Sequence, residues 1–392
     1  MSVHRVQANP QGHRAPVPVM FLTTSLPVGG AETLLADLVR RLDRTRFRPE
    51  ICCLKGRGTL GAALAREIPV FSGLLHHRLD LAVLRRLVRL LRRRGVRAVV
   101  TVGTGDKMFW GRLSAWLAGV PVIVSALHSS GRPYAVQRLN RLLTPITNAF
   151  VAVADVHRLN LIASEGLPPG KVRVIRNGVD LDRFGPRSRS EARRRIGLPD
   201  DARVAGIIAA LRPEKNHEAF LRVAARVRSA LPEARFLVVG DGPRRRTLER
   251  MSADLGLERM VGFVGERHDI PEMLAAMDVV VLSSYTEASP VCLLEAMAAA
   301  RPVVAPSVGS IAESVNDGET GLLANPGDEP ALAARIAWLL RDPATAERFG
   351  QAGRRLVAKR HDVRRMVAGY EALFDELLAV ARGRELPADV RP

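Results

Sequence analysis

The feature that most constrains the fold is the stretch 279–305, in which two short apolar runs enclose a polar loop and a helix. Residues 279–282 are continuously apolar, which predicts a strand buried on both faces of a parallel sheet. A polar loop at 283–290, a helix at 291–300 and a second strand at 302–305 follow. Ligands bind beyond the carboxyl ends of the strands in such units, so we expect a binding site at this loop.

The start of the predicted helix suits an anion, because its first N–H groups are unpaired and lie at the positive end of the helix dipole. Pro290 has no N–H, so the amides of Val291 and Cys292 would be the donors. Glu287 lies in the loop, and the side chain of Glu295 points back toward the same helix start. Carboxylates accept hydrogen bonds from hydroxyls, so this pair beside an anion site suggests a nucleotide sugar. By spacing alone, a solvated Glu287 and a Glu295 paired with arginine remain an alternative.

Strands and helices alternate along the rest of the chain, which indicates α/β domains with doubly wound parallel sheets. A length of 392 residues suits two such domains. We expect a disordered tail at 1–16, one domain at 17–184 and a second domain from 185 onward. Further strands are predicted at 17–23, 50–54, 98–102, 120–124, 150–153, 172–175, 203–211 and 236–239.

The chain is strongly basic, with a net charge of +19. Only five of its 59 basic residues are lysine, and such arginine usage can reflect a GC-rich genome. Aromatic residues make up only 4%, which argues against a surface that stacks on bases, so no nucleic-acid partner is expected. The three cysteines, Cys52, Cys53 and Cys292, suggest neither a disulfide framework nor a metal quartet. No membrane span or secretory signal is predicted, and we expect a cytoplasmic protein.

Residues 78–97 form the most basic predicted helix. One face carries an apolar stripe and the other an arginine face, a pattern that predicts attachment to an anionic membrane surface. The alternative is a helix that covers the sheet and turns its arginines to solvent. The predicted stripe consists of Leu81, Leu84, Leu87, Val88 and Leu91.

Several segments together resemble the GT4-type retaining glycosyltransferases of group 1, which have the GT-B fold. The segment E-A-S-P-V-C-L-L-E, from Glu287 to Glu295, looks like the E-x7-E motif of that family. G-G-A-E at 29–32, N-G-V-D at 177–180, L-R-P-E-K-N-H at 211–217 and G-D-G-P at 240–243 match other family segments in the correct order. The resemblance covers about residues 17–380.

The resemblance implies two Rossmann-like domains that face a cleft. The domain at 17–184 would be on the acceptor side, and the domain at 185–361 would bind the nucleotide sugar. A last helix, within 362–392, would cross back to the first domain. The implied catalytic residues are His128, Glu287, Lys215 and Arg212. The implied donor-binding residues are Gly29, Gly30, Arg212, Lys215, Val264, Glu287, Ser289, Val291, Cys292 and Glu295.

Each assigned role follows from charge or hydrogen bonding. Lys215 and Arg212 would neutralise the departing diphosphate, while Glu295 would bind the ribose and Glu287 the transferred sugar. His128 would touch the donor sugar, although a lone histidine is often structural. The helix start would lower the pKa of Cys292, although packing is the preferred role of that side chain.

Three positions depart from the family pattern. Ala210 stands where the family usually has arginine, Ala288 where it has glycine, and Ser310 replaces a second glycine. Because Ala210 carries no charge, contact with the leaving diphosphate would depend more on Lys215.

We therefore expect a retaining glycosyltransferase that moves a sugar from a nucleoside-diphosphate sugar to an acceptor hydroxyl. Cell-surface polysaccharide or glycolipid synthesis would supply a carbohydrate or lipid-linked acceptor, and no metal or other cofactor is expected. The alternatives are a sugar-nucleotide epimerase on the same fold and a non-catalytic nucleotide-sugar-binding protein. Peripheral attachment at the inner face of the membrane would follow from the basic helix.

Overall fold

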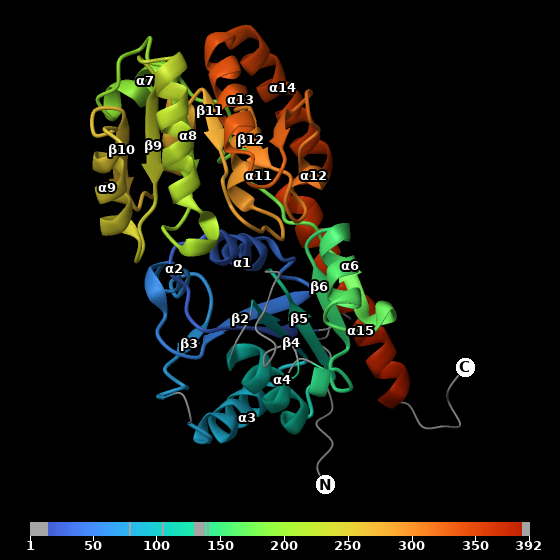
Figure 1. Cartoon of the computed structure of the whole chain (residues 1–392). Coiled ribbons are helices and arrows are strands. Elements are labelled where there is room, and N and C mark those ends of the chain that lie inside the picture. Colours follow the sequence, from blue (N-terminus) through green and yellow to red (C-terminus); the bar gives the residue numbers. More distant parts are fainter. Residues whose placement is uncertain (1–14, 78–79, 104–105, 129–137, 139–140, 386–392) are drawn as a thin grey trace. The chain divides into compact units, whose positions relative to one another are not determined.

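The structure, a computed structural model, describes residues 15–77, 80–103, 106–128, 138 and 141–385 (Figure 1). The chain divides into two compact units. The first comprises Met1–Val153, Arg158–Ile175 and Met366–Pro392, and the second comprises Ala154–His157 and Arg176–Arg365. Residues 176–184 thus belong to the second unit, whereas the sequence analysis places them in the first domain. Most of the expected tail at 1–16 lies outside the described residues.

The first unit is a parallel sheet of seven strands in the order β3-β2-β1-β4-β5-β6-β7. The chain turns back at β1, so the strand order reverses between β1 and β4. The strands are β1 Val17–Thr23, β2 Phe47–Cys53, β3 Val70–Ser72, β4 Ala98–Val102, β5 Val122–Ala126, β6 Ala149–Ala152 and β7 Val172–Val174. The helices between them are α1 Gly30–Arg41, α2 Gly58–Leu64, α3 Ala82–Arg94, α4 Asp106–Ala118 and α6 Asp155–Ala163.

Alternating side chains of β1 supply both faces of this sheet, as expected for a strand buried on both sides. Met20 and Leu22 are fully buried in one cluster with Val83 and Leu87 of α3. Phe21 points the other way and meets the ring of Phe374 at 6.4 Å. Helices therefore cover both faces of the sheet, which leaves its strand ends for ligands.

The second unit is a parallel sheet of six strands in the order β10-β9-β8-β11-β12-β13, and its order reverses between β8 and β11. The strands are β8 Val204–Ile208, β9 Arg235–Val239, β10 Val261–Gly265, β11 Val279–Val281, β12 Val303–Pro306 and β13 Gly321–Ala324. The helices are α7 Arg189–Arg195, α8 His217–Ala230, α9 Arg245–Asp254, α10 Ile270–Ala276, α11 Val291–Ala298, α12 Ile311–Ser314, α13 Glu329–Arg341 and α14 Pro343–Arg360.

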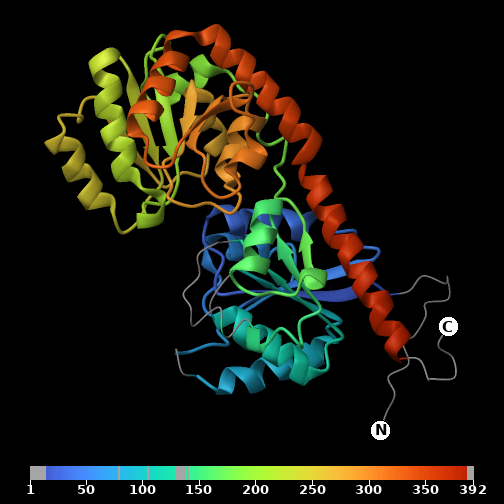
Figure 2. The same ribbon diagram turned by 45° about the vertical axis from the view of Figure 1, so that its right-hand side comes forward.

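Two buried clusters lie on opposite faces of this second sheet. On one face α8 and α13 lie side by side (Figure 2), and Phe220 packs edge-on against Phe236 with ring centres 5.9 Å apart. On the other face Leu293 and Met297 of α11 are fully buried. The predicted doubly wound α/β architecture is therefore present in each unit.

The last helix, α15 Val363–Glu385, begins in the second unit and continues in the first. Within the first unit, Phe374 contacts Phe47 with ring centres 5.6 Å apart, and Tyr370 packs beside it. Apolar side chains of α15 thus form part of the first unit's core.

Candidate active site

The loops after β8 and β11 lie beside each other, because these two strands pair at the point where the strand order reverses. The amide of Tyr285 donates to the carbonyl oxygen of Glu214 at 3.1 Å. The hydroxyl of Ser283 donates to the carbonyl oxygen of Lys215 at 3.0 Å. Hydrogen bonds therefore join the segments 214–215 and 283–285 into one continuous surface.

Lys215 and Glu287 form an ion pair at the centre of this surface. The Nζ atom of Lys215 lies 2.6 Å from Oε1 of Glu287. The hydroxyl of Ser284 donates to the same oxygen at 2.7 Å. Glu287 is only 8% exposed, so its charge is held by these two donors rather than by water.

The ammonium of Lys215 is held in its charged form. Burial is the largest single effect and opposes the charge, but Glu287, together with Cys292 and Glu214, outweighs it, so the pKa of Lys215 is raised above its ordinary value. At neutral pH this loop therefore presents a fixed cation at the carboxyl edge of the sheet.

A left-handed residue places Lys215 in this position. Pro213–Lys215 form one short 3-10 turn, and Asn216 follows with φ +50°. Asparagine is among the few residues that tolerate this conformation. Its side chain then accepts a hydrogen bond from the amide of Ala219 and caps α8. The R-P-E-K-N-H segment is thus a turn that ends one element and starts the next.

Arg212 lies in the same loop but is exposed. In the part of the chain that the structure describes, its side chain forms no hydrogen bond or ion pair. The structure therefore brings Lys215, and not Arg212, to Glu287.

The loop that carries Glu287 is clamped by residues that follow β12. The amide of Ser310 donates to the carbonyl oxygen of Glu287, and its hydroxyl donates to that of Ala288. Gly309 has φ +56°, and a Cβ atom there would overlap the carbonyl oxygen of Glu287. No local pattern in the sequence shows which loop this segment holds.

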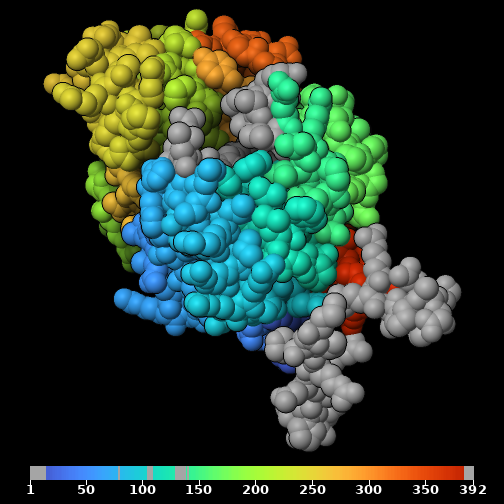
Figure 3. Space-filling view, turned by 90° about the horizontal axis from the view of Figure 1, so that it is seen from below, coloured from blue at the N-terminus to red at the C-terminus, as the bar shows by residue number. Residues whose placement is uncertain are grey.

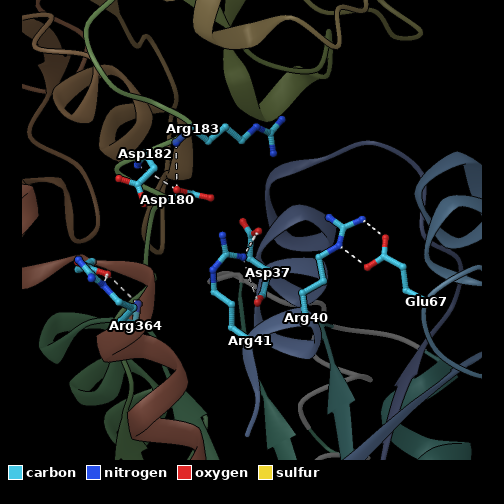
Figure 4. Close-up of polar contacts among 9 residues, drawn as sticks. Asp37, Arg40, Arg41, Glu67, Asp180, Asp182, Arg183 and Arg364 are labelled. Carbon is cyan, nitrogen blue, oxygen red and sulfur yellow. Dashed lines mark hydrogen bonds and ion pairs between the residues drawn. The ribbon is translucent and has the colours of Figure 1, made fainter. Parts of the chain in front are cut away.

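A second clamp comes from Asn177 in the N-G-V-D segment. Its side-chain amide donates to the carbonyl oxygen of Ser289 at 3.0 Å. Its own carbonyl oxygen lies 3.0 Å from Nδ1 of the buried His361. The turn that follows is capped by Asp180, whose carboxylate accepts the amides of Asp182 and Arg183 (Figure 4).

The prediction that the helix start lowers the pKa of Cys292 is wrong. Burial raises the pKa of its thiol to about 12, and although Lys215 works against this, the carboxylates of Glu287 and Glu295 add to it. The helix start therefore does not activate this cysteine. Both Glu287 and Glu295 act on this one thiol, and the role of Glu295 at the ribose stays a prediction.

Comparison with known proteins decides the family. A family described as "Glycosyl transferases group 1" matches residues 188–356, which contain Lys215, Glu287 and Glu295. A second, "Glycosyltransferase Family 4", matches residues 28–183. The chain belongs to the group 1 glycosyltransferases.

The names of similar proteins refer to different glycosyl transfer reactions. A D-inositol 3-phosphate glycosyltransferase of Stackebrandtia nassauensis is 34% identical over 266 residues, which is 58% of each chain. The alpha-D-kanosaminyltransferase of Streptomyces kanamyceticus is 29% identical and covers 72% of this chain and 77% of its own. The chain thus matches less than two thirds of the length of the first relative.

Solved structures show the fold. HepE of Anabaena, in complex with UDP and glucose, has a TM-score of 0.81 at 24% identity and covers 91% of this chain and 99% of its own. Sucrose-phosphate synthase of Thermosynechococcus elongatus has a TM-score of 0.76 at 20% identity over 93% of this chain and 100% of its own. The predicted GT-B fold is confirmed.

The first unit of the glycosyltransferase places the other predicted residues at the carboxyl edge of its own sheet. Gly29 and Gly30 follow β1 and start α1, with Gly29 in an extended conformation. His128 follows β5 and is half-buried, while the loop residues 129–137 after it lie outside the described residues. On α1, Arg40 pairs with Glu67 and Arg41 with Asp37 (Figure 4), so these two cations already have carboxylate partners.

Val264 is less central than the other donor-site candidates. It is half-buried on β10, the edge strand of the second sheet, and β9 separates it from β8. It therefore shares the sheet with Lys215 but not the point where the strand order reverses.

The basic helix α3 differs in detail from its predicted pattern. Val83, Leu87 and Leu91 are buried, whereas Leu81, which the sequence analysis placed in the apolar stripe, is 73% exposed. Leu81 precedes α3, which begins at Ala82, and Leu84 and Val88 of the predicted stripe are half-buried. Figure 3 shows the face that α3 and α4 form, in cyan and teal. Among the expected surface arginines, Arg86 pairs with Asp80 and Arg94 with Glu50.

No helix in the described part of the chain is long and apolar enough to cross a membrane. No group of three histidine, cysteine, aspartate or glutamate side chains in it converges as metal ligands. The expectation that no metal is needed stays a prediction.

Proposed function

We propose that the chain transfers a sugar from a nucleoside-diphosphate sugar to an acceptor hydroxyl, with retention of the anomeric configuration. The observation that carries this proposal is the Lys215–Glu287 pair beside the start of α11, where the strand order of the second sheet reverses. A fixed cation, unpaired helix amides and a buried carboxylate suit a diphosphate linked to a sugar.

Lys215 and the first amides of α11, at Val291 and Cys292, would hold the diphosphate and stabilise its growing charge as it leaves. Both described contacts of the Glu287 carboxylate fall on Oε1, so Oε2 is available to accept a hydroxyl of the transferred sugar. Glu295 would accept the ribose hydroxyls. Arg212, exposed in the same loop, would reach the diphosphate from solvent.

Retention would follow from attack on the same face that the leaving group departs from. The bond from the anomeric carbon to the phosphate oxygen breaks, and the acceptor oxygen bonds to that carbon on the same face. A phosphate oxygen takes the acceptor proton. The Cys292 thiol does not suit a covalent route, since burial raises its pKa to about 12. His128 and the Gly29–Gly30 turn would contact the donor sugar from the first unit.

UDP-glucose is the first donor to test, because the similar HepE structures contain UDP, glucose and UDP-glucose. Inositol 3-phosphate, malate and a lipid-linked sugar are the first acceptors. Relatives carry names that refer to the first two, and the lipid-linked sugar would fit cell-surface polysaccharide or glycolipid synthesis.

The deciding experiment titrates UDP, GDP and ADP calorimetrically into the wild type and Glu295→Ala. One nucleoside diphosphate should bind at micromolar concentration and weaken about tenfold or more in the variant. Turnover of the corresponding sugar donor with each acceptor follows, with and without EDTA, and product NMR reports the anomeric configuration.

The outcomes separate the alternatives. Transfer to an acceptor supports the proposal, interconversion of the donor without an acceptor indicates an epimerase, and binding without any turnover indicates a non-catalytic protein. If none of the three nucleotides binds, the nucleotide-sugar proposal fails.

We also propose that α3 attaches the chain to an anionic membrane surface. Leu81, Trp116 and Leu117 are exposed, by 73%, 54% and 39%. Beside them a hollow of about 550 Å³ is lined by Leu84 and Val88 together with the exposed Arg85, Arg89, Arg92 and Arg93. Apolar side chains would enter the interface while the arginines meet lipid phosphates.

Sedimentation with phosphatidylcholine vesicles, with and without phosphatidylglycerol, tests this attachment. Binding should require the anionic lipid and should be lost when Arg85, Arg89 and Arg93 become glutamate. The matched control changes Arg226, Arg250 and Arg259, which are exposed in the second unit, to glutamate. Equal loss in both triple variants would mean that only the net charge matters and would overturn the assignment to α3.

A further inference from the structure

The second unit holds a cavity of about 540 Å³ that none of the predicted donor residues lines. Arg203, Asp278 and Pro302 line it, and each lies at or just before the amino end of its strand, β8, β11 and β12. The donor loops follow the carboxyl ends of β8 and β11. Because these strands are parallel, the cavity and the donor loops lie at opposite edges of one sheet.

Arg301 is the unusual member of the cavity wall. It is only 8% exposed, and its Nε atom is buried without a hydrogen-bond partner. Within the described residues, no hydrogen bond or ion pair of its guanidinium is found. Burying a cation without a partner is strongly disfavoured. The buried Arg301 therefore points to a bound anion that pairs with its guanidinium.

The neighbouring charges do not serve as that partner. Asp278 is the nearest carboxylate by its effect on Arg301, but its two oxygens are taken by Arg189 at 3.1 Å and Arg193 at 2.7 Å. The amide of Val204 also donates to it at 2.8 Å. Burial, followed by repulsion from Arg189, lowers the pKa of Arg301 to about 10. Arg189 and Arg193 thus share the Asp278 carboxylate, and Arg301 forms no ion pair with it.

The cavity also contains carboxylates suited to hydroxyl groups. Asp201 and Glu347 line it, and neither forms an ion pair in the described part of the chain. These carboxylates would repel a bare polyanion but accept hydrogen bonds from hydroxyls. The volume lies within the range of small-molecule sites.

We propose that this cavity binds a small hydroxylated organic phosphate, of the sugar-phosphate kind. Its phosphate group meets Arg301 and Arg189, because guanidinium groups match phosphate oxygens in charge and shape. Its hydroxyls meet Asp201 and Glu347. The site is separate from the donor loops, since the length of a five-residue strand, about 16 Å, lies between the two edges. The helix α11 starts at the donor loop, and Ala299, Ala300 and Arg301 follow its end at the cavity wall.

Calorimetry on the full chain tests this site with glucose 6-phosphate, inorganic phosphate and glucose as probes. Glucose 6-phosphate should bind at millimolar concentration or tighter, more strongly than inorganic phosphate, and glucose should not bind. The affinity should fall about tenfold or more in Arg301→Met and should persist in Lys215→Ala, which alters only the donor loops.

The matched control is Arg226→Met, which removes an exposed arginine of the same unit and should leave glucose 6-phosphate binding unchanged. If Arg301→Met fails to fold by circular dichroism, Arg189→Met, at a residue that is 46% exposed, replaces it and should also weaken binding. The proposal is overturned if glucose 6-phosphate does not bind, if inorganic phosphate binds equally well, or if the binding is lost in Lys215→Ala but kept in the cavity variants. None of these results depends on whether the chain transfers a sugar.

Discussion

The two units share one strand order around the point where it reverses, but their loops at that point differ. In the first unit, the loop after β1 ends in Gly29 and Gly30. In the second unit, the corresponding loop after β8 carries Lys215, which pairs with Glu287 from the loop after β11. The same topology therefore presents a bare backbone in one case and a charged pair in the other.

This difference teaches that the topology only selects the place, while the loop residues select the chemistry. Glycines allow a ligand to approach the backbone closely, and they add no charge. A buried cation–carboxylate pair, in contrast, costs stability unless a function or further hydrogen bonds retain it. We therefore assign the charge stabilisation to the second unit, and four predictions test that assignment.

The largest effect is expected from Lys215→Met. Removing the cation takes away the group that would stabilise the leaving diphosphate and leaves the Glu287 carboxylate buried with one donor fewer. We expect kcat to fall about 10³-fold, or ~4 kcal/mol, in initial-rate measurements with the donor identified by calorimetry. Lys359→Met, at an exposed lysine of the same unit, is the control. A fall in kcat of less than about tenfold would contradict the assignment of charge stabilisation to the second unit.

The glycines of the two units should also differ in how much unfolding free energy the protein loses when each is replaced by alanine. Gly309→Ala forces a Cβ atom onto the Glu287 backbone in a left-handed conformation, and we expect a loss of about 3 kcal/mol or more in unfolding free energy. Gly318→Ala has the same left-handed strain but open space, so about 1 kcal/mol is expected. In Gly29→Ala the new atom meets only the flexible Glu32 side chain, so less than about 1 kcal/mol is expected. Urea denaturation would measure all three, and equal losses would contradict the clamping role of Gly309.

The second unit should also lose stability in acid. Burial lowers the pKa of His217 to about 4, and burial likewise lowers the pKa of His361. The unfolded chain binds protons more readily than the folded one between these lowered values and the ordinary value of 6.5, so stability falls as the pH drops through that window. We expect at most about 3 kcal/mol from His217.

Fluorescence of Trp338, with Trp110 and Trp116 replaced by phenylalanine, would follow unfolding of the second unit at pH 7 and in the acid window. In the same tryptophan background, His217→Gln should reduce the loss of unfolding free energy between pH 7 and the acid window. An unchanged pH dependence in this variant would show that His217 does not cause the acid sensitivity.

The smallest effect concerns the thiols, for which the two units should behave alike. Burial raises the pKa of Cys292 to about 12, of Cys53 to about 11, and of Cys52 still further. Alkylation of the native protein at pH 8 should therefore be about 10²-fold slower for Cys53, and about 10³-fold or more slower for Cys52 and Cys292, than for a free thiol, and in guanidine it should reach all three cysteines. Mass spectrometry after brief iodoacetamide treatment measures this, and rapid labelling of native Cys292 would restore the idea of an activated thiol.

Much of the fold is readable in the sequence because its signals are local. The apolar runs at 17–23 and 98–102 coincide with β1 and β4 in full, since a strand buried on both faces shows as a continuous apolar segment. The boundary between the units was harder to place. The N-G-V-D segment pairs with His361 and Asp362, more than 180 residues away, and this puts it in the second unit.

The residues of the candidate site likewise fall into some that the sequence predicts and others that it does not. Lys215, Glu287 and Glu295 were predicted because each lies within a short segment of family character. Ser284 and Gly309 were not assigned to the site. The contact of Ser284 with Glu287 depends on how their loop is folded, and Gly309 meets the Glu287 backbone from a different segment. The exposure of Leu81 and the direction of the Cys292 pKa shift were mispredicted because both depend on what packs around these side chains.

By itself, the sequence determined two doubly wound α/β units, the family, and the residues at the carboxyl ends of β8 and β11. It did so because hydrophobic periodicity and turn chemistry act over a few residues. Only the tertiary structure decided that Lys215 pairs with Glu287, that Gly309 clamps the Glu287 loop, and that Arg301 is buried without a partner. Burial and pairing depend on segments that are brought together across the sheet, and desolvation then sets the energy of each charge.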